Sequence, residues 1–158
     1  MGTRSLTYIE QSYETCVADE ENNNEVHETK QNILCMYRQY DGYLSNYGMD
    51  LAKFLQDFII VNGINSLTPK RAANGLGCLA AQLIQHFKNG IGNVYIYHPD
   101  AEDCGEEYTY TISKLGKSNI CIKVHAVTGW GDDYAKKLIF EGTPKQLIEK
   151  VNAEAVKA

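Results

Sequence analysis

The sequence contains no run of apolar residues near the length of about 20 that a membrane-spanning helix requires. Its N-terminus also lacks the apolar segment and cleavage site of a secretory signal peptide. From these two absences we expect a cytoplasmic protein with no membrane partner.

Arginine is scarce as well, since Arg4, Arg38 and Arg71 are the only three in the sequence. The formal net charge is -5 and the sequence pI is about 5.3. Proteins that bind long nucleic acids neutralise many phosphates with a dense patch of lysine and arginine. The composition therefore argues against a long nucleic acid as partner. Two or three cations placed together can still hold one small phosphorylated ligand.

The five cysteines form neither a Cys-X-X-Cys pair nor a cysteine–histidine pattern that binds zinc. The four histidines include no pair at metal-binding spacing. We expect free thiols, no metal and no cofactor. Cys35 and Cys121 lie in apolar, strand-like runs, the ordinary setting of a buried thiol. Cys104, beside Gly105 in an acidic segment, is the one candidate for a reactive thiol.

The length of 158 residues and the hydrophobic content of 44% suit a single domain with a core of its own. Period-2 and period-3.6 patterns both occur, which predicts an α+β fold spanning residues 1–158. We expect an antiparallel or mixed sheet of about five to six strands. Two consecutive helices should cover one face of this sheet, and a C-terminal helix should follow.

The N-terminal third of the chain predicts two strands separated by a loop. The strands are expected over residues 3–9 and 32–37. Residues 13–31, which include the acidic and amide-rich run 19–25, have no apolar periodicity and predict a mobile acidic loop. Further strands are expected over residues 94–97, 108–112, 120–124 and 135–141.

Apolar residues at helical spacing predict three helices. The first begins near Asn46 and ends at Gly63, and the second spans about 72–88. Gly75 and Gly77 would let a neighbouring backbone pack closely against the second helix. The sequence Gly142-Thr143-Pro144 predicts the start of the third helix, because Thr143 can cap it and proline suits its first turn.

The run MYRQYDGY at residues 36–43 is the most informative part of the sequence. Arg38 offers a planar fork of donors for phosphate or carboxylate. Gln39 and Asp41 can bind hydroxyl groups or base edges, and the tyrosines provide faces for stacking. The run lies just before the expected start of a helix, where free backbone N–H groups can also hold an anion. This mixture indicates a site for a planar, polar ligand.

A structural interpretation of the same run is equally open. Alternation along a strand would place Arg38 and Tyr40 on one face and Tyr37 and Gln39 on the other, so about half of the run could contact one ligand. The tyrosines could instead line the rim of the core, with Arg38 paired to Asp41 across a turn.

A second polar segment, residues 100–107, contains five carboxylates. Their spacing does not match a calcium-binding loop, and a solvated acidic turn is the favoured interpretation. Glu107 is the exception, because it enters the next predicted strand beside Tyr108. The predicted ligand-binding residues are Arg38, Gln39, Tyr40, Asp41, Tyr43, Glu107 and Tyr108.

These motifs resemble a family of uncharacterised small proteins found in phages, prokaryotes and large viruses and marked by a YRQYDGY-type motif. The resemblance rests on residues 37–43, Gly48, and residues 51–55, 78–83 and 103–108. It implies no established chemistry. In that family proline, glycine and histidine often occupy the positions held here by Leu44, Asn46 and Tyr47, so a histidine base at the last position would be missing from this chain.

Three kinds of function are compatible with these residues. The first is a non-enzymatic protein that binds a nucleotide-like ligand; in a phage it would resemble the sponges that sequester cyclic-nucleotide or ADP-ribose-derived immune signals, and it would act in the host cytoplasm. The second is a hydrolase of a phosphorylated or glycosidic small molecule, with Asp41 and Glu107 as paired carboxylates. The third is a structural module whose tyrosines form an oligomer interface. We also expect a homo-oligomer, with a dimer favoured.

Overall fold

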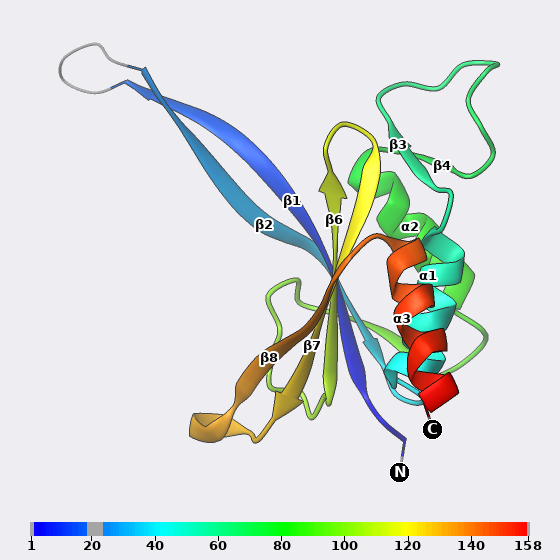
Figure 1. The fold of residues 1–158 in the computed structure, drawn as a ribbon. Helices are drawn as coiled ribbons and strands as arrows, with labels where there is room; N and C mark the ends of the chain where they lie inside the picture. The colour runs from blue at the N-terminus through cyan, green and yellow to red at the C-terminus, as the bar shows by residue number, and fades with distance from the viewer. Residues whose placement is uncertain (1, 19–23, 158) are drawn as a thin grey trace.

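A computed structural model gives the structure of residues 2–18 and 24–157, with side chains described for residues 2–13 and 27–157. Its main feature is a mixed sheet of six strands in the order β5-β2-β1-β6-β7-β8 (Figure 1). Strands β1 and β6 are parallel, and all other neighbours are antiparallel. The strands are β1 (Ser5–Ala18), β2 (Asn24–Arg38), β5 (Val94–Tyr97), β6 (Tyr108–Leu115), β7 (Asn119–Thr128) and β8 (Ala135–Gly142).

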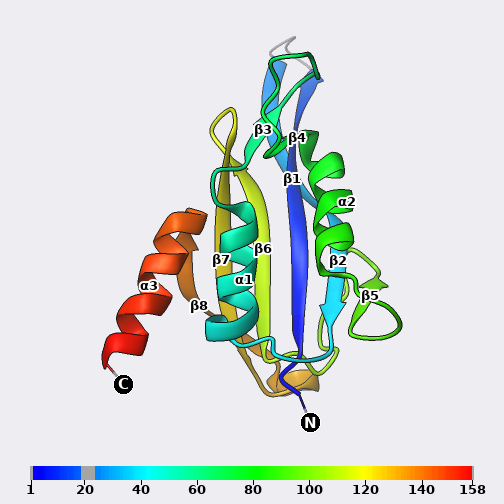
Figure 2. The ribbon, with the colours of Figure 1, turned by 90° about the vertical axis from the view of Figure 1, so that its right-hand side faces the viewer.

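The helices lie on one face of this sheet (Figure 2). A π-helical turn at Leu44–Gly48 leads into α1 (Met49–Leu55), and the two longer helices are α2 (Gly75–Phe87) and α3 (Pro144–Lys157). Two short strands, β3 (Ile59–Val61) and β4 (Ala72–Asn74), pair in parallel beside α2. The sheet and the three helices confirm the α+β architecture predicted from the sequence.

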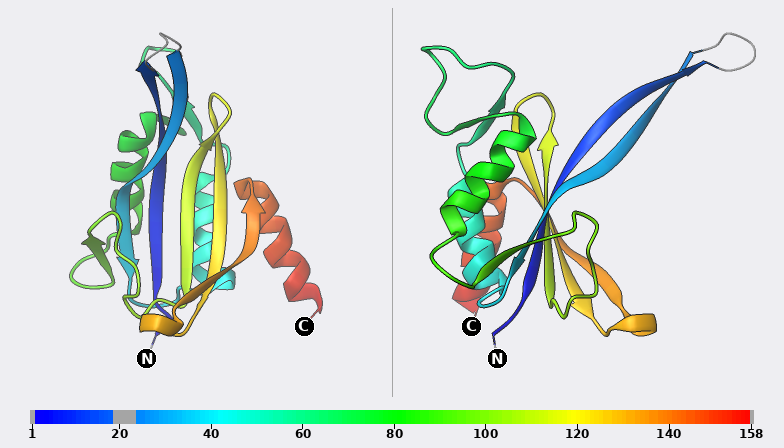
Figure 3. Two further views of the ribbon diagram at one scale, coloured as in Figure 1. Left: turned by 90° about the vertical axis from the view of Figure 1, so that its left-hand side faces the viewer. Right: turned by 180° about the vertical axis from the view of Figure 1, so that it is seen from behind.

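Apolar side chains fill the space between the sheet and the helices. The largest fully buried ones include Tyr47, Leu51 and Leu79 from the helical side and Met36 and Tyr110 from the sheet. A smaller cluster lies on the other face of the sheet, where the segment between β5 and β6 crosses the strands (Figure 3). It consists of Leu6, Tyr8, Cys35 and Tyr37. The sheet is therefore covered on both faces, by helices on one side and by a connecting segment on the other.

The acidic loop expected over residues 13–31 is mostly a β-hairpin. Strand β1 continues to Ala18 and β2 begins at Asn24, and the two pair without a break from Glu10↔Asn32 to Ala18↔Asn24. The loop prediction was wrong for residues 13–18 and 24–31 because the strands form through pairing with each other, while their sequence has no apolar periodicity. Residues 19–23 lie outside the described part of the chain.

Both predicted helices of the first half are shorter than expected. Helix α1 ends at Leu55, and Asp57 adopts a left-handed conformation with a φ of 64° that separates the helix from β3. Residues 72–74 form strand β4 instead of the first turn of α2. The close packing expected at Gly75 and Gly77 is also wrong, because a Cβ atom at either position would meet nothing within 4 Å.

Gly42 is the glycine on which the local fold depends most. Its backbone N–H donates to the Thr3 carbonyl at 2.9 Å, and its own carbonyl accepts from the Tyr110 hydroxyl at 2.7 Å. A Cβ atom here would lie 2.9 Å from Cβ of Ser5 and 3.0 Å from the carbonyl carbon of Arg4. The segment after β2 can therefore cross closely over the start of β1 only with glycine at this position.

We expect Gly42→Ala to lower the free energy of unfolding by about 1–3 kcal/mol, because the added methyl group forces backbone atoms apart in a packed region. Gly77→Ala is the matched control. It adds the same methyl group to α2 in open space and should raise stability by up to about 1 kcal/mol. Urea unfolding of the two variants measures both effects, and equal stability of the two would contradict the packing role of Gly42.

Candidate functional site

The alternation of β2 determines which side chains of the tyrosine-rich run lie together. Leu34 and Met36 belong to the main core beneath the helices, whereas Cys35 and Tyr37 belong to the cluster on the opposite face. Arg38, the last residue of β2, continues the first series and lies on the helical side. The ring of Tyr37 stacks on Tyr97 at a centroid distance of 4.7 Å, so it is separated from Arg38 by the sheet.

The guanidinium of Arg38 lies over aromatic rings. Its central carbon is 4.9 Å from the ring centroid of Tyr47 and 5.8 Å from that of Phe87. Nε donates a hydrogen bond of 2.9 Å to the carbonyl of Tyr40. Within the described residues no carboxylate lies within ion-pair distance of this guanidinium, and the pairing with Asp41 considered from the sequence is not formed. The terminal nitrogens of Arg38 are thus available to an anion.

Arg38 opens into a cleft of about 610 Å³ between the end of β2 and the first two helices. We call it the Arg38 cleft. Helix α1 contributes Asp50, Lys53 and Phe54 to its lining, and α2 contributes His86 and Phe87. Arg71, Asn89 and Asn93, from the connecting segments, complete the lining.

The Arg38 cleft concentrates positive charge on an acidic protein. Two of the three arginines of the chain and Lys53 line it, against a single carboxylate, that of Asp50. Such a local excess of one sign attracts a ligand of the opposite sign even when the net charge of the protein is negative.

Arg71 is held in place by the C-terminal end of α1. Its guanidinium donates to the carbonyls of Lys53 at 3.1 Å, Phe54 at 2.6 Å and Gln56 at 2.9 Å. These are carbonyls that a helix end leaves without intrahelical partners, and a cation there also complements the helix dipole. The contacts fix the position of a second guanidinium at the border of the cleft.

Aromatic surface and a buried acceptor complete the Arg38 cleft. The rings of Phe54 and His86 stack at a centroid distance of 4.2 Å and an interplanar angle of 20°. Asn93 has a left-handed backbone with a φ of 64°, and its carbonyl accepts from the backbone N–H of Gln39 at 2.8 Å. The side-chain oxygen Oδ1 of Asn93 is buried without a hydrogen-bond partner in the structure. A buried acceptor without a hydrogen bond lowers the stability of the folded protein.

The other predicted ligand-binding residues do not join Arg38. Tyr43 and Tyr108 line a second cleft of about 640 Å³ beside β8 and α3, together with Lys137 and Lys150. The crossing segment with Gly42 packs on Ser5, which is the β1 partner of both Arg38 and Tyr108. This segment lies between the two clefts, so the structure does not bring the seven predicted residues together in one cleft.

Four predicted residues lie outside both clefts. Tyr40 is half exposed and packs against Gly2, where a Cβ atom would come within 2.8 Å of its ring. Asp41 is exposed with a φ of 56°, and its carbonyl accepts from the N–H of Tyr47. Gln39 borders the Arg38 cleft only through its backbone bond to Asn93. Glu107 is exposed, and its N–H donates to the Arg4 carbonyl.

The structure identifies Glu106, not its neighbour Glu107, as the carboxylate with a defined environment. Glu106 is only 4% exposed. Its Oε2 accepts from the N–H of Cys104 at 2.7 Å, and its Oε1 accepts from the N–H of Asp103 at 3.0 Å and from the Tyr134 hydroxyl. The only sequence signal for it was the acidic segment itself, which does not distinguish adjacent glutamates.

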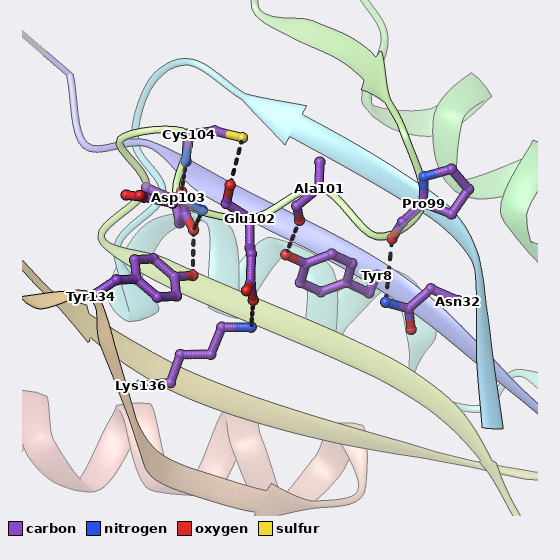
Figure 4. A network of polar contacts seen from close by, with 10 residues as sticks. Tyr8, Asn32, Pro99, Ala101, Glu102, Asp103, Cys104, Tyr134 and Lys136 are labelled. Atoms are coloured by element: carbon purple, nitrogen blue, oxygen red, sulfur yellow. Dashed lines mark hydrogen bonds and ion pairs between the residues drawn. The ribbon is translucent and has the colours of Figure 1, made fainter. Parts of the chain in front are cut away.

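The contacts around Glu106 continue across the sheet face opposite the helices (Figure 4). Lys136 forms an ion pair with Glu102 at 3.5 Å and lies 5.3 Å from the ring centroid of Tyr8. The Tyr8 hydroxyl donates to the Ala101 carbonyl. Burial raises the pKa of the Tyr8 phenol, with smaller contributions from Cys35, Tyr134 and the glutamates. These contacts fasten the segment between β5 and β6 onto the sheet and are structural in character.

The four thiols of the described residues are free. Cys35, Cys78, Cys104 and Cys121 form no disulfide. Burial, followed by the charges of Glu106, Asp103 and Glu102, raises the pKa of the Cys104 thiol, and burial raises that of Cys35 to about 12. Because the thiolate is the nucleophile, the surroundings of Cys104 oppose the reactivity considered from the sequence.

No group of three or more histidine, cysteine, aspartate or glutamate side chains in residues 2–13 and 27–157 is placed to hold a metal ion. None of the helices in this part of the chain is both long and apolar enough to cross a membrane.

Comparison of the chain with protein-family models, with curated proteins and with solved structures found no match. The function is therefore inferred from the geometry of the Arg38 cleft.

Proposed function

We propose that this chain is a non-enzymatic protein that binds a small anionic ligand with a planar ring, of the nucleotide type, in the Arg38 cleft. The observation that carries the proposal is the guanidinium of Arg38, which lies over the Tyr47 and Phe87 rings with no carboxylate partner among the described residues. An arginine side chain that packs on aromatic rings and has no carboxylate partner can bind an anionic ligand.

Three features of the cleft match three parts of such a ligand. Arg38, Lys53 and the border residue Arg71 supply cations for a phosphate group. The stacked pair of Phe54 and His86 offers an aromatic surface for a base or another planar ring. Asn93, another residue of the lining, carries a side-chain amide that can form a hydrogen bond with a polar group of the ligand.

Binding is favoured over turnover by the contacts inside the cleft. The imidazole of His86 stacks on Phe54, and no hydrogen bond among the described residues joins it to Asp50 or to a nucleophile. A hydrolase built on Asp41 and Glu107 has less support, because both residues are exposed and neither lines the Arg38 cleft. Buried Tyr47 is no substitute for a histidine base: burial raises the pKa of its phenol, and its hydroxyl is paired with that of Thr7 at 2.7 Å.

The biological role of this binding rests on the family resemblance alone. If the chain is phage-encoded, a protein that binds a nucleotide-like signal tightly and leaves it intact would act as a sponge against a host immune pathway. Cyclic nucleotides and ADP-ribose derivatives are then the first ligands to test.

The proposal is tested with a panel of mononucleotides, cyclic dinucleotides and ADP-ribose derivatives. We expect at least one to raise the melting temperature, since a ligand that binds only the folded state stabilises it by mass action. The complex is then heated, and the released compound is analysed by mass spectrometry. Release of the unchanged compound supports binding without turnover. A chemically altered product would identify an enzyme, and the absence of any shift across the panel would reject the nucleotide class.

A further inference from the structure

The Arg38 cleft contains one carboxylate, that of Asp50, beside its three cations. Asp50 belongs to the first turn of α1 and is exposed to solvent. Within the described residues its carboxylate forms neither an ion pair nor a hydrogen bond, although three cationic side chains line the same cleft. The carboxylate is therefore available to hydrogen-bond donors of a ligand.

Asp50 lies beside the aromatic surface of the cleft. Phe54 follows it by four residues on α1, and side chains at this spacing are neighbours on a helix, with about 5–6 Å between their Cβ atoms. Both residues line the cleft, and the ring of Phe54 stacks on that of His86. A base that stacks on this aromatic pair consequently has an edge near the Asp50 carboxylate.

The carboxylate and the fixed guanidinium of Arg71 lie at opposite ends of α1. Arg71 donates to the carbonyl of Gln56, the residue that follows the helix, whereas Asp50 is in its first turn. Six residues of helix separate these positions by about 9 Å along the helix axis. A phosphate group near Arg71 is thus kept away from the like charge of Asp50, while another part of the same ligand can reach the carboxylate.

The chemistry of a carboxylate distinguishes between the nucleobases. An ionised carboxylate accepts hydrogen bonds and donates none. The Watson–Crick edge of guanine carries two adjacent donors, N1–H and the N2 amino group, which one carboxylate can accept together. Adenine and cytosine present one amino group next to a ring nitrogen with a lone pair, and uracil presents a single N–H between two carbonyl groups. Only guanine therefore offers both carboxylate oxygens a donor.

We propose that Asp50 selects a guanine base, so that the ligand of the Arg38 cleft is a guanine nucleotide. This inference rests on the proposed function, because it assigns the base of the ligand whose phosphate the cations of the cleft bind. Two charge-assisted hydrogen bonds to guanine are strong, whereas adenine places a lone pair against the negative carboxylate. Discrimination comes from both effects, the attraction of the right base and the repulsion of the wrong one.

The first experiment compares ligands that differ only in the base. Titration calorimetry measures the dissociation constants of GMP and AMP, and of cyclic di-GMP and cyclic di-AMP. In at least one pair the guanine compound is expected to bind at least about tenfold more tightly. Binding of guanine and adenine compounds with equal affinity would overturn this inference and leave the proposed function intact. Absence of binding to every nucleotide would overturn the proposed function and this inference with it.

A second experiment tests whether Asp50 itself carries the preference. In Asp50→Asn, the ratio of the adenine to the guanine dissociation constant is expected to fall at least about tenfold, because the amide accepts only one of the two guanine donors. The ratio is the decisive measurement, since loss of a negative charge in the cleft strengthens the binding of both phosphates alike. Asp57→Asn is the matched control: Asp57 is exposed outside the Arg38 cleft, and asparagine readily adopts its left-handed conformation. An equal ratio in the two variants would remove Asp50 from base recognition.

Two analogues of the guanine compound show which donors the carboxylate accepts. The inosine analogue lacks the N2 amino group and is expected to bind at least about fivefold more weakly to the intact protein, but not to Asp50→Asn. The 2′-deoxyguanosine analogue lacks a ribose hydroxyl and is expected to bind as the guanine compound does. The opposite result, a loss of affinity with the deoxy analogue alone, would show that Asp50 binds the ribose and would overturn the selection of guanine.

Discussion

Replacement of Arg38 by glutamine is expected to weaken ligand binding roughly 30- to 150-fold while the protein keeps its fold. Loss of charge-assisted hydrogen bonds to a phosphate costs about 2–3 kcal/mol, and each 1.4 kcal/mol corresponds to about a tenfold change in affinity. Titration calorimetry with the nucleotide that gives the largest thermal shift measures the effect. The change should appear in affinity, because Arg38 is proposed to contact the ligand directly.

The effect of Arg38→Gln on stability should be smaller. The substitution removes the hydrogen bond from Nε to the Tyr40 carbonyl and the contact of the guanidinium with the Tyr47 ring, which together contribute about 1–2 kcal/mol. Arg4→Gln is the matched control, because Arg4 lies beside Gly105 and does not line the Arg38 cleft. If both variants bind the nucleotide as the unchanged protein does, Arg38 has no part in recognition.

Replacement of Glu106 by alanine is expected to lower the free energy of unfolding by about 3 kcal/mol. Three donors lose their acceptor at once: the N–H groups of Asp103 and Cys104 and the hydroxyl of Tyr134. A buried donor left without a partner costs about 1–3 kcal/mol, although water can reach part of this segment and reduces the sum. Glu107→Ala is the control, and as a change at an exposed neighbour it should stay within about 0.5 kcal/mol.

The thiol of Cys104 gives a second measurement on the same variant. Burial and the nearby carboxylates, Glu106 first among them, hold the pKa of this thiol above its ordinary value. Removal of Glu106 takes away a negative charge that opposes the thiolate and loosens the segment that buries the sulfur, so the pKa should fall. A lower pKa means more thiolate at pH 8, and alkylation of Cys104 should be faster than in Glu107→Ala. Equal rates and equal unfolding energies in the two variants would show that Glu106 does not organise this segment.

Local sequence patterns predicted most strands and the third helix, whereas features that depend on long-range packing were not predictable. The strands expected over residues 94–97, 108–112, 120–124 and 135–141 all exist, and α3 begins at Pro144 as the Gly-Thr-Pro sequence predicts. In these segments the apolar residues that recur at regular spacing are the ones that face the core. The spacing of apolar residues therefore indicates which face of the element is buried. The hairpin of residues 11–18 and 24–31 was missed because its strands depend on pairing with each other, and their sequence has no apolar periodicity.

The site was predictable only in part, for a similar reason. Alternation correctly separated Tyr37 from Arg38, because the two faces of a strand follow from its geometry alone. The separation of Tyr43 from Arg38 depends on the segment that crosses β1, which is held by Thr3 and Tyr110, residues far away in the sequence. Arg71 and Asn93 were not predicted for the same reason, since they reach the cleft from connecting segments whose paths no local pattern describes.

The amino-acid sequence by itself determined the α+β class, most of the strands and the acidic character of the chain, and it singled out Arg38 as a candidate, because these follow from composition, periodicity and the chemistry of single side chains. Only the tertiary structure decided that Arg38 shares a cleft with Arg71, Phe54, His86 and Asn93, that the tyrosines are divided between separate surfaces, and that Glu106 is the carboxylate held in place. Such groupings depend on how distant segments pack across a curved sheet, and that packing is a property of the whole chain.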